Sequence, residues 1–241
     1  MNDLLLKAQE ALYIKDGRAA LNYAQQLVDQ EETNSQAWFI AMQCFQLIYP
    51  IEQYDASNEL TCAKYAIRFS PKENKYQMRK NVYSFLMTKI LDVLERDAEV
   101  LADGRALIGF YQRTVYFDAA GAAEKTRLQD EPIMNAVTKS FAYCEALFDF
   151  IPDSFLRRNR VLNSKAAEIA RQWQTTYSYL AMRVGLYHME LTPEQIHDGL
   201  ARYARYLRAV DNREAMMQEI APYNTIHEDQ SLLFGLPDHQ A

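Results

Sequence analysis

The amino-acid sequence predicts an all-α protein. Only 7 glycines and 7 prolines occur in 241 residues, which leaves little material for tight β-turns. The long uninterrupted runs are rich in Ala, Leu, Gln, Glu, Lys and Arg, which are good helix formers. Apolar residues recur in these runs at the three- and four-residue spacing of a helix. We therefore expect antiparallel helical hairpins joined by short connections.

Composition indicates an ordinary globular protein. The chain is 49% apolar and 24% charged, with a net charge of −6. Its first residues lack the basic start and apolar core of a secretory signal. The most apolar window, residues 37–51, is too short for a membrane span and is interrupted by Gln43, Gln46 and Pro50. We expect a cytoplasmic protein without membrane association.

The first three helices are expected over residues 3–15, 18–30 and 36–49, and a fourth starts at Asp55 or Ser57 and ends at Phe69. Asp16-Gly17 should end the first, with a left-handed residue at the glycine. Asn34 is placed to cap the third helix, and Pro50 to end it.

A longer helix is expected over residues 74–101. Ser70-Pro71-Lys72-Glu73 has the pattern of a start signal, in which Ser70 caps the helix and Glu73 completes a capping box. Asp103-Gly104 is expected to end the helix. Its apolar stripe comprises Val82, Phe85, Leu86, Ile90, Val93, Leu94 and Leu101.

Further helices are expected over residues 105–117, 131–151, 157–190, 194–210 and 213–220. The helix at 131–151 is expected to carry an apolar stripe of Ile133, Val137, Phe141, Cys144 and Phe148. Pro152-Asp153-Ser154 starts a new segment, and a joint is expected near Asn163-Ser164. We divide the chain into hairpins plus the long helix (1–102), a C-terminal helical region (103–221) and a flexible tail (222–241). The C-terminal region is either a set of diverged repeats or a separate bundle.

Residues 4–73 contain two successive variants of one pattern. In the second, Trp38 is followed by Ala41-Met42 and Phe45, and the segment closes with Ala66 to Pro71. The first keeps Ala20-Leu21 but has Leu4, Ala11 and Glu32 at the corresponding Trp, aromatic and Pro positions. The stretch resembles tetratricopeptide repeats, which are helix–turn–helix units of about 34 residues. The second unit is longer by about five residues, near Tyr49-Pro50.

The resemblance implies a short right-handed superhelix that binds a peptide or helix of a partner protein. A groove in such a repeat is lined by the first helix of each hairpin. Lys75 and Arg79, four residues apart, can present two positive charges to one carboxylate, as in repeats that grip a partner's C-terminus. Leu5, Gln9 and Gln43 depart from that clamp. The expected partner-binding residues are Gln9, Phe39, Gln43, Gln46, Lys75 and Arg79.

An alternative function is nucleic-acid binding by the region from Arg157 to Arg208. This region holds nine basic and four acidic residues, a charge of +5, so the rest of the chain carries −11. Basic residues interleaved with aromatics can bind a phosphate backbone and stack on bases. The alternative site comprises Arg202, Tyr203, Arg205, Tyr206 and Arg208. The structural interpretation is that this region docks on acidic parts of the chain or of a second copy.

No catalytic motif stands out, so we expect a non-enzymatic scaffold without a cofactor. His188 and His197 match no metal-site spacing, and no metal site is expected. The carboxylates Asp92, Glu95, Asp97 and Glu99, with Lys89 and Arg96 among them, are expected to form a solvated helix face. Cys44, Cys62 and Cys144 are expected to be buried free thiols. The apolar tail segment Leu232–Leu236 is a candidate ligand for the protein's own groove or for a neighbour's.

Overall fold

The computed structural model describes residues 3–48, 56–114 and 135–186. At residues 46, 103–114 and 178–186 it describes the backbone only. These residues are helical and include no strand, which confirms the all-α prediction. The chain divides into two compact units, Met1–Leu86 and Met87–Ala241. In the described ranges, no helix is both long and apolar enough to cross a bilayer.

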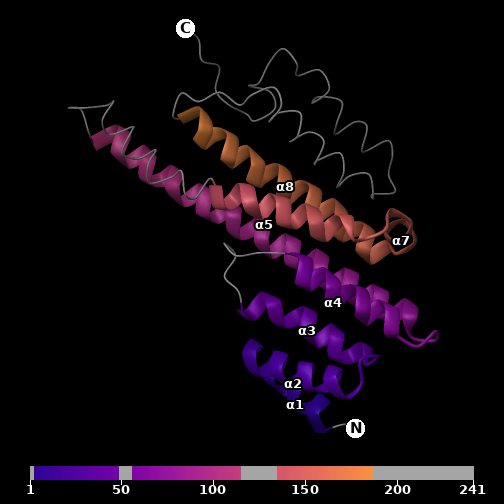
Figure 1. The fold of residues 1–241 in the computed structure, drawn as a ribbon. Coiled ribbons are helices and arrows are strands. Elements are labelled where there is room, and N and C mark those ends of the chain that lie inside the picture. The colour runs from indigo at the N-terminus through magenta and orange to yellow at the C-terminus, as the bar shows by residue number, and fades with distance from the viewer. Residues whose placement is uncertain (1–2, 49–55, 115–134, 187–241) are drawn as a thin grey trace. The chain divides into compact units, whose positions relative to one another are not determined.

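The first unit is a succession of packed helices (Figure 1). It contains α1 (Asp3–Tyr13), α2 (Gly17–Gln30), α3 (Ser35–Ile48), α4 (Ala56–Phe69) and the first residues of α5 (Lys75–Thr114). Helix α1 packs on α2, α2 on α3, and α3 on α4, while α1 also contacts α3. The four predicted helix ranges are confirmed to within two residues.

Small residues lie where these helices meet. Six alanines of α1 to α4 have no exposed surface: Ala8, Ala20, Ala24, Ala37, Ala63 and Ala66. A small residue on one helix accepts a bulky residue of the next, so the helices can cross closely. Leu27 and Val28 supply bulk beside Ala37, and Leu4, Leu5 and Trp38 pack around this cluster.

Trp38 ties the start of α3 to α4. Its indole Nε1–H donates a hydrogen bond to the Glu32 carbonyl oxygen at 2.8 Å. Its ring lies 4.8 Å from that of Tyr65, which in turn stacks on Phe69 at 5.6 Å between centroids. Trp38 is half-buried, so it anchors the edge of the core rather than its centre.

The connections α1–α2 and α2–α3 are each closed by a side-chain cap. Asn34 Oδ1 accepts from the Ala37 N–H at 3.1 Å, which confirms the predicted cap of α3. Asp16 caps α2 by accepting from the Ala19 N–H at 3.0 Å. The left-handed residue is Lys15, with φ 62°, and not Gly17.

Gly17 is instead needed for close packing on α3. A Cβ at this position would lie 2.6 Å from Leu47 Cβ and 3.3 Å from the Cys44 carbonyl oxygen. Both of those atoms are held by the backbone of α3, so a flexible side chain cannot move aside to make room. The glycine thus allows the first turn of α2 to approach α3 closely.

The capping box predicted at Ser70 is wrong. Residues 72–74 form a turn in which the Asn74 N–H donates to the Pro71 carbonyl oxygen at 3.0 Å, and α5 begins only at Lys75. The Ser70 hydroxyl is buried and has no hydrogen-bond partner among the described residues. Ser70 is therefore buried and does not cap α5.

The helix stop predicted at Asp103-Gly104 is also wrong, because α5 continues through it to Thr114. A glycine inside a helix costs about 1 kcal/mol relative to alanine. Its neighbours here, Val100-Leu101-Ala102 and Arg105-Ala106-Leu107, favour helix strongly enough to carry the chain through. The separate helix expected over 105–117 is the end of α5 as far as residue 114.

The described part of the second unit comprises α5 from Met87 onward, a helix at residues 135–149, α7 (Asp153–Arg158) and α8 (Arg160–Leu186). The predicted stripe of Val137, Phe141, Cys144 and Phe148 is buried. Trp173 of α8 stacks on Tyr177 at 4.8 Å and lies 5.9 Å from Phe141. As expected, Pro152 immediately precedes a new helix.

The joint predicted near Asn163-Ser164 lies at Asn159. This residue closes α7, since its N–H donates to the Leu156 carbonyl oxygen at 3.0 Å. Its side-chain oxygen then accepts from the Leu162 N–H at 3.3 Å, which caps α8. Asn163 is inside α8 because its own N–H is bonded to the Asn159 carbonyl oxygen.

We predict that Gly17→Ala destabilises the first unit by about 1–3 kcal/mol, the usual cost of an overpacked contact. The added methyl forces α2 and α3 apart at their closest point. Urea unfolding followed by circular dichroism measures the change. Arg18→Ala, at the next and exposed position of α2, is the control and should change stability by less than about 0.5 kcal/mol. Equal stability of Gly17→Ala and wild type would contradict this account.

We predict that Trp38→Ala lowers the free energy of unfolding by about 2–3 kcal/mol, less than for a fully buried tryptophan. Trp38→Phe keeps the aromatic contact with Tyr65 but loses the bond to Glu32, so it should cost only about 1 kcal/mol. Denaturant unfolding of the three proteins tests this order. An unchanged unfolding midpoint in Trp38→Ala would show that Trp38 does not contribute to the stability of the core.

Candidate functional site

The predicted partner-binding residues lie on three helices of the first unit. Gln9 is exposed on α1, and Phe39 and Gln43 are half-buried on α3. Gln46 is also on α3, with its side chain outside the described set. Lys75 and Arg79 are in the first turns of α5. The helices that carry Gln9 and Phe39 contact each other.

Gln9 lines an open hollow of about 670 Å³ formed by α1, α2 and the turn between them. Two large side chains at its edge are solvent-exposed, Tyr13 by 88% and Ile14 by 71%. Aromatic and aliphatic side chains exposed beside polar ones are typical of protein-binding surfaces. Neither residue was predicted to be part of the site, although the sequence places both at the end of the first helix, just before the Asp16-Gly17 turn, where exposure is common.

Lys75 and Arg79 differ in how freely they can meet a ligand. Lys75 Nζ lies 3.5 Å from the carbonyl oxygen of Arg68, near the end of α4, and is half-buried. Arg79 is exposed. Burial raises the pKa of Tyr83, and the positive charge of Arg79 partly offsets this rise, which places the guanidinium near that phenol. Arg79 is therefore the more accessible cation of the pair.

The alternative nucleic-acid residues Arg202, Tyr203, Arg205, Tyr206 and Arg208 lie outside the described residues. Within the described part of the basic region, four arginines are exposed: Arg157, Arg158, Arg160 and Arg171. Lys165 is half-buried, and its Nζ donates to the Thr88 hydroxyl oxygen at 2.5 Å.

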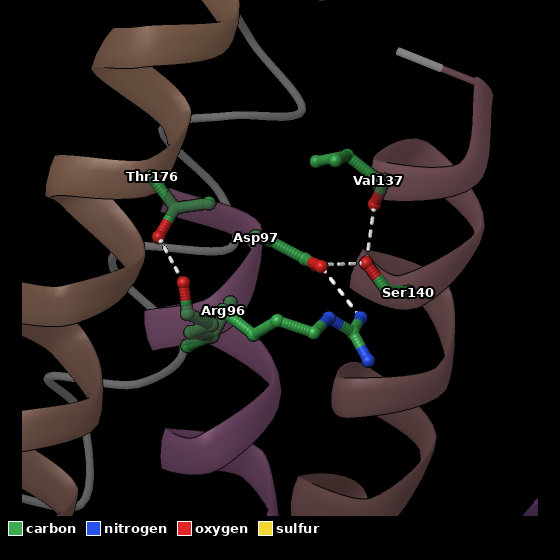
Figure 2. Close-up of polar contacts among 6 residues, drawn as sticks. Arg96, Asp97, Val137, Ser140 and Thr176 are labelled. Carbon is green, nitrogen blue, oxygen red and sulfur yellow. Dashed lines mark hydrogen bonds and ion pairs between the residues drawn. The ribbon is translucent and has the colours of Figure 1, made fainter. Parts of the chain in front are cut away.

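A buried polar cluster lies in the second unit, where α5, the helix at 135–149 and α8 meet. We call it the Asp97 cluster and define it by Arg96, Asp97, Ser140 and Thr176 (Figure 2). The Thr176 hydroxyl lies 2.9 Å from the carbonyl oxygens of Leu94 and Gln172, which ties α8 to α5. Ser140 ties the helix at 135–149 to α5 through Asp97.

Asp97 is the centre of this cluster and is only 3% exposed. Its Oδ1 accepts from Arg96 Nη2 at 2.6 Å, and its Oδ2 is hydrogen-bonded to the Ser140 hydroxyl. The Ser140 oxygen also lies 2.8 Å from the Val137 carbonyl oxygen. Arg96 binds Asp97 through Nη2 alone, and its Nη1 is buried with no hydrogen-bond partner in the described residues.

The surroundings of Asp97 favour the protonated form of its carboxyl group more than water does. Burial raises the pKa of this carboxyl, and the hydrogen bonds from Ser140 and Arg96 offset the rise only in part. The buried thiol of Cys144 is influenced by Asp97, Arg96 and Lys89, and burial raises its pKa far above the ordinary range. Lys89 is also buried, with Nζ 5.2 Å from the Tyr143 ring centroid.

The solvated face expected on α5 is only partly right. Asp92, Glu95 and Glu99 are exposed, but Asp97 and Lys89 are buried. The burial of Asp97 could have been predicted from the spacing of residues in the sequence. Asp97 is three residues after Leu94 and four before Leu101, so it lies on the predicted apolar stripe, while Ser140 holds the matching place between Val137 and Cys144.

The three cysteines are free and buried, as predicted. Burial raises the pKa of Cys44 to about 12 and that of Cys62 to about 11, so neither thiol is a reactive thiolate at neutral pH. Across the described residues, no group of three His, Cys, Asp or Glu side chains could hold a metal ion. His188 and His197 lie outside these residues.

Comparisons with models of protein families, with curated proteins and with solved structures each gave no match.

We predict that Asp97→Asn becomes progressively more stable relative to wild type as pH rises from about 4, the ordinary aspartate pKa. The folded pKa of Asp97 is raised, so the folded state binds the proton more tightly than the unfolded state does. That contribution is complete below the unfolded pKa and is lost as pH rises through the folded one. The slope is at most about 1.4 kcal/mol per pH unit.

Urea unfolding of both proteins between pH 3.5 and about pH 8 measures this difference. Asp97→Ala serves as the control that removes the carboxyl without an isosteric replacement. It leaves the Arg96 guanidinium without its buried acceptor and should cost about 3 kcal/mol. A difference between wild type and Asp97→Asn that does not change with pH would show that the folded pKa is ordinary.

Proposed function

We propose that this protein is a non-enzymatic scaffold whose first unit binds a peptide or helix of a partner protein. The proposed mode of binding follows from the resemblance of residues 4–73 to tetratricopeptide repeats. The first helices of successive hairpins would line one surface, and the second helices would support it from behind. The proposed surface comprises α1, α3 and the first turns of α5.

The observation that carries this proposal is the contact of α1 with α3, in addition to the contact of each with α2. It gives the first helices of the two hairpins one continuous surface. That surface carries exposed Gln9 and half-buried Phe39 and Gln43. Polar side chains beside a partly accessible aromatic suit recognition of a peptide by hydrogen bonds and apolar contact together.

The hollow beside Gln9, lined by α1, α2 and the turn between them, offers further apolar area to a partner. Tyr13 and Ile14 are large side chains that face solvent there. Aromatic residues are enriched at protein interfaces, where they bury a large area with few rotatable bonds. We propose that a partner covers Tyr13 and Ile14.

Nucleic-acid binding is the second candidate, favoured by the exposed arginines at the α7–α8 junction. Arg157, Arg158 and Arg160 place three positive charges within four residues. An acidic partner protein would meet the same charges, so treatment with nuclease separates the two cases.

We predict that Arg79→Glu abolishes capture of the partner from a nuclease-treated cell extract, because it reverses the charge at the accessible cation of the surface. Lys75→Glu is a poorer test, since it would place a carboxylate beside the Arg68 carbonyl oxygen. Lys64→Glu is the matched control. It reverses another exposed positive charge, on α4, a second helix of a hairpin.

The outcomes separate the two functions. Capture that survives nuclease and Lys64→Glu but is lost in Arg79→Glu supports the scaffold. Capture that nuclease removes, and that Arg157→Glu/Arg158→Glu also removes, would assign the function to the basic region. Circular dichroism of each variant checks that its helix content is unchanged.

A further inference from the structure

The Ser140 hydroxyl has one hydrogen and two oxygen atoms within reach. Asp97 Oδ2 and the Val137 carbonyl oxygen are both hydrogen-bonded neighbours of Ser140 Oγ (Figure 2). A hydroxyl group donates one hydrogen bond and accepts up to two. A carbonyl oxygen can only accept, so Ser140 cannot satisfy both neighbours fully while Asp97 is ionised.

We propose that Asp97 is a proton-uptake site and that Ser140 reverses its hydrogen bond when the proton binds. With Asp97 ionised, the Ser140 O–H donates to Asp97 Oδ2. When Oδ2 takes up a proton from solvent, its new O–H donates to Ser140 Oγ, and the Ser140 hydrogen turns to the Val137 carbonyl oxygen. Both neighbours of Ser140 are then fully bonded.

The surroundings of Asp97 make both states accessible. Its carboxyl group is almost wholly buried, which opposes ionisation, whereas a single bond from Arg96 Nη2 supports it. The other titratable group of the described residues that acts with Asp97 is Cys144, on the helix at 135–149, and Lys89 acts on that thiol from α5. Helix α8 contributes the Thr176 hydroxyl, which contacts the backbone of α5 at Leu94.

The consequence is a proton-dependent connection between α5 and the helix at 135–149. The link is a charge-assisted bond when Asp97 is ionised and a chain of hydrogen bonds from the carboxyl group through Ser140 to Val137 when Asp97 is protonated, and the two helices stay joined in both states. The raised pKa of Asp97 places the exchange above the range of an ordinary aspartate. The cluster therefore reports protonation of Asp97 through the Val137 carbonyl group.

Selective isotope labelling can follow this reversal in the intact protein. Val137-Thr138 is the only Val-Thr pair in the chain, so ¹³C-carbonyl valine with ¹⁵N threonine gives one signal assigned to Val137. Labelled aspartate, compared between wild type and Asp97→Asn, identifies the carboxyl signal of Asp97. Both signals are recorded as pH falls from neutrality.

We expect the Val137 carbonyl signal to shift with the same midpoint as the Asp97 carboxyl group, above the ordinary aspartate value. In Ser140→Ala the carbonyl shift should disappear while Asp97 still titrates. In Asp97→Asn the carbonyl signal should stay constant near its acid position. A Val137 signal that ignores the Asp97 titration, or that still follows it in Ser140→Ala, would overturn the proposal, as would an Asp97 midpoint in the ordinary range.

Discussion

The first unit depends on close contact between helices. Six alanines of α1 to α4 have no exposed surface, and Gly17 leaves no room for a larger side chain without moving a helix. Helix α1 contacts α3 as well as α2, which is the geometry that the proposed binding surface needs. Packing of small residues in the interior thus determines which side chains remain outside, among them Tyr13, Gln9 and Arg79.

Much of this architecture could be predicted from sequence because local chemistry and helical periodicity agree. Asn34 caps α3 as its side chain and position require. The predicted stripes are buried over residues 137–148 and on α5, except at Phe85, which is half-buried. The errors fall where packing overrides a local signal. Ser70 is drawn into the interior instead of capping α5, Gly104 continues a helix that its neighbours favour, and Asn159 rather than Asn163 separates two helices.

The candidate sites were less predictable because their accessibility depends on tertiary contacts. Nothing in the spacing of Lys75 and Arg79 shows that one of them reaches a backbone carbonyl group and that the other is exposed. The Asp97 cluster was missed for a different reason. Charged residues were assumed to be solvated, although Asp97 and Lys89 occupy positions on an apolar stripe, where burial follows from periodicity alone. A charged residue on such a stripe should be predicted to be buried and paired before it is assigned to a solvated face.

Hydrogen–deuterium exchange of the full chain, alone and with its captured partner, tests the central claim most directly. If the first unit is the binding surface, the partner should slow exchange in peptides from α1, α3 and residues 75–86, because their backbone hydrogen bonds open less often under a bound ligand. Peptides from α7 and α8 should exchange as before. Slower exchange confined to α7 and α8 would contradict the scaffold account and would assign binding to the basic region.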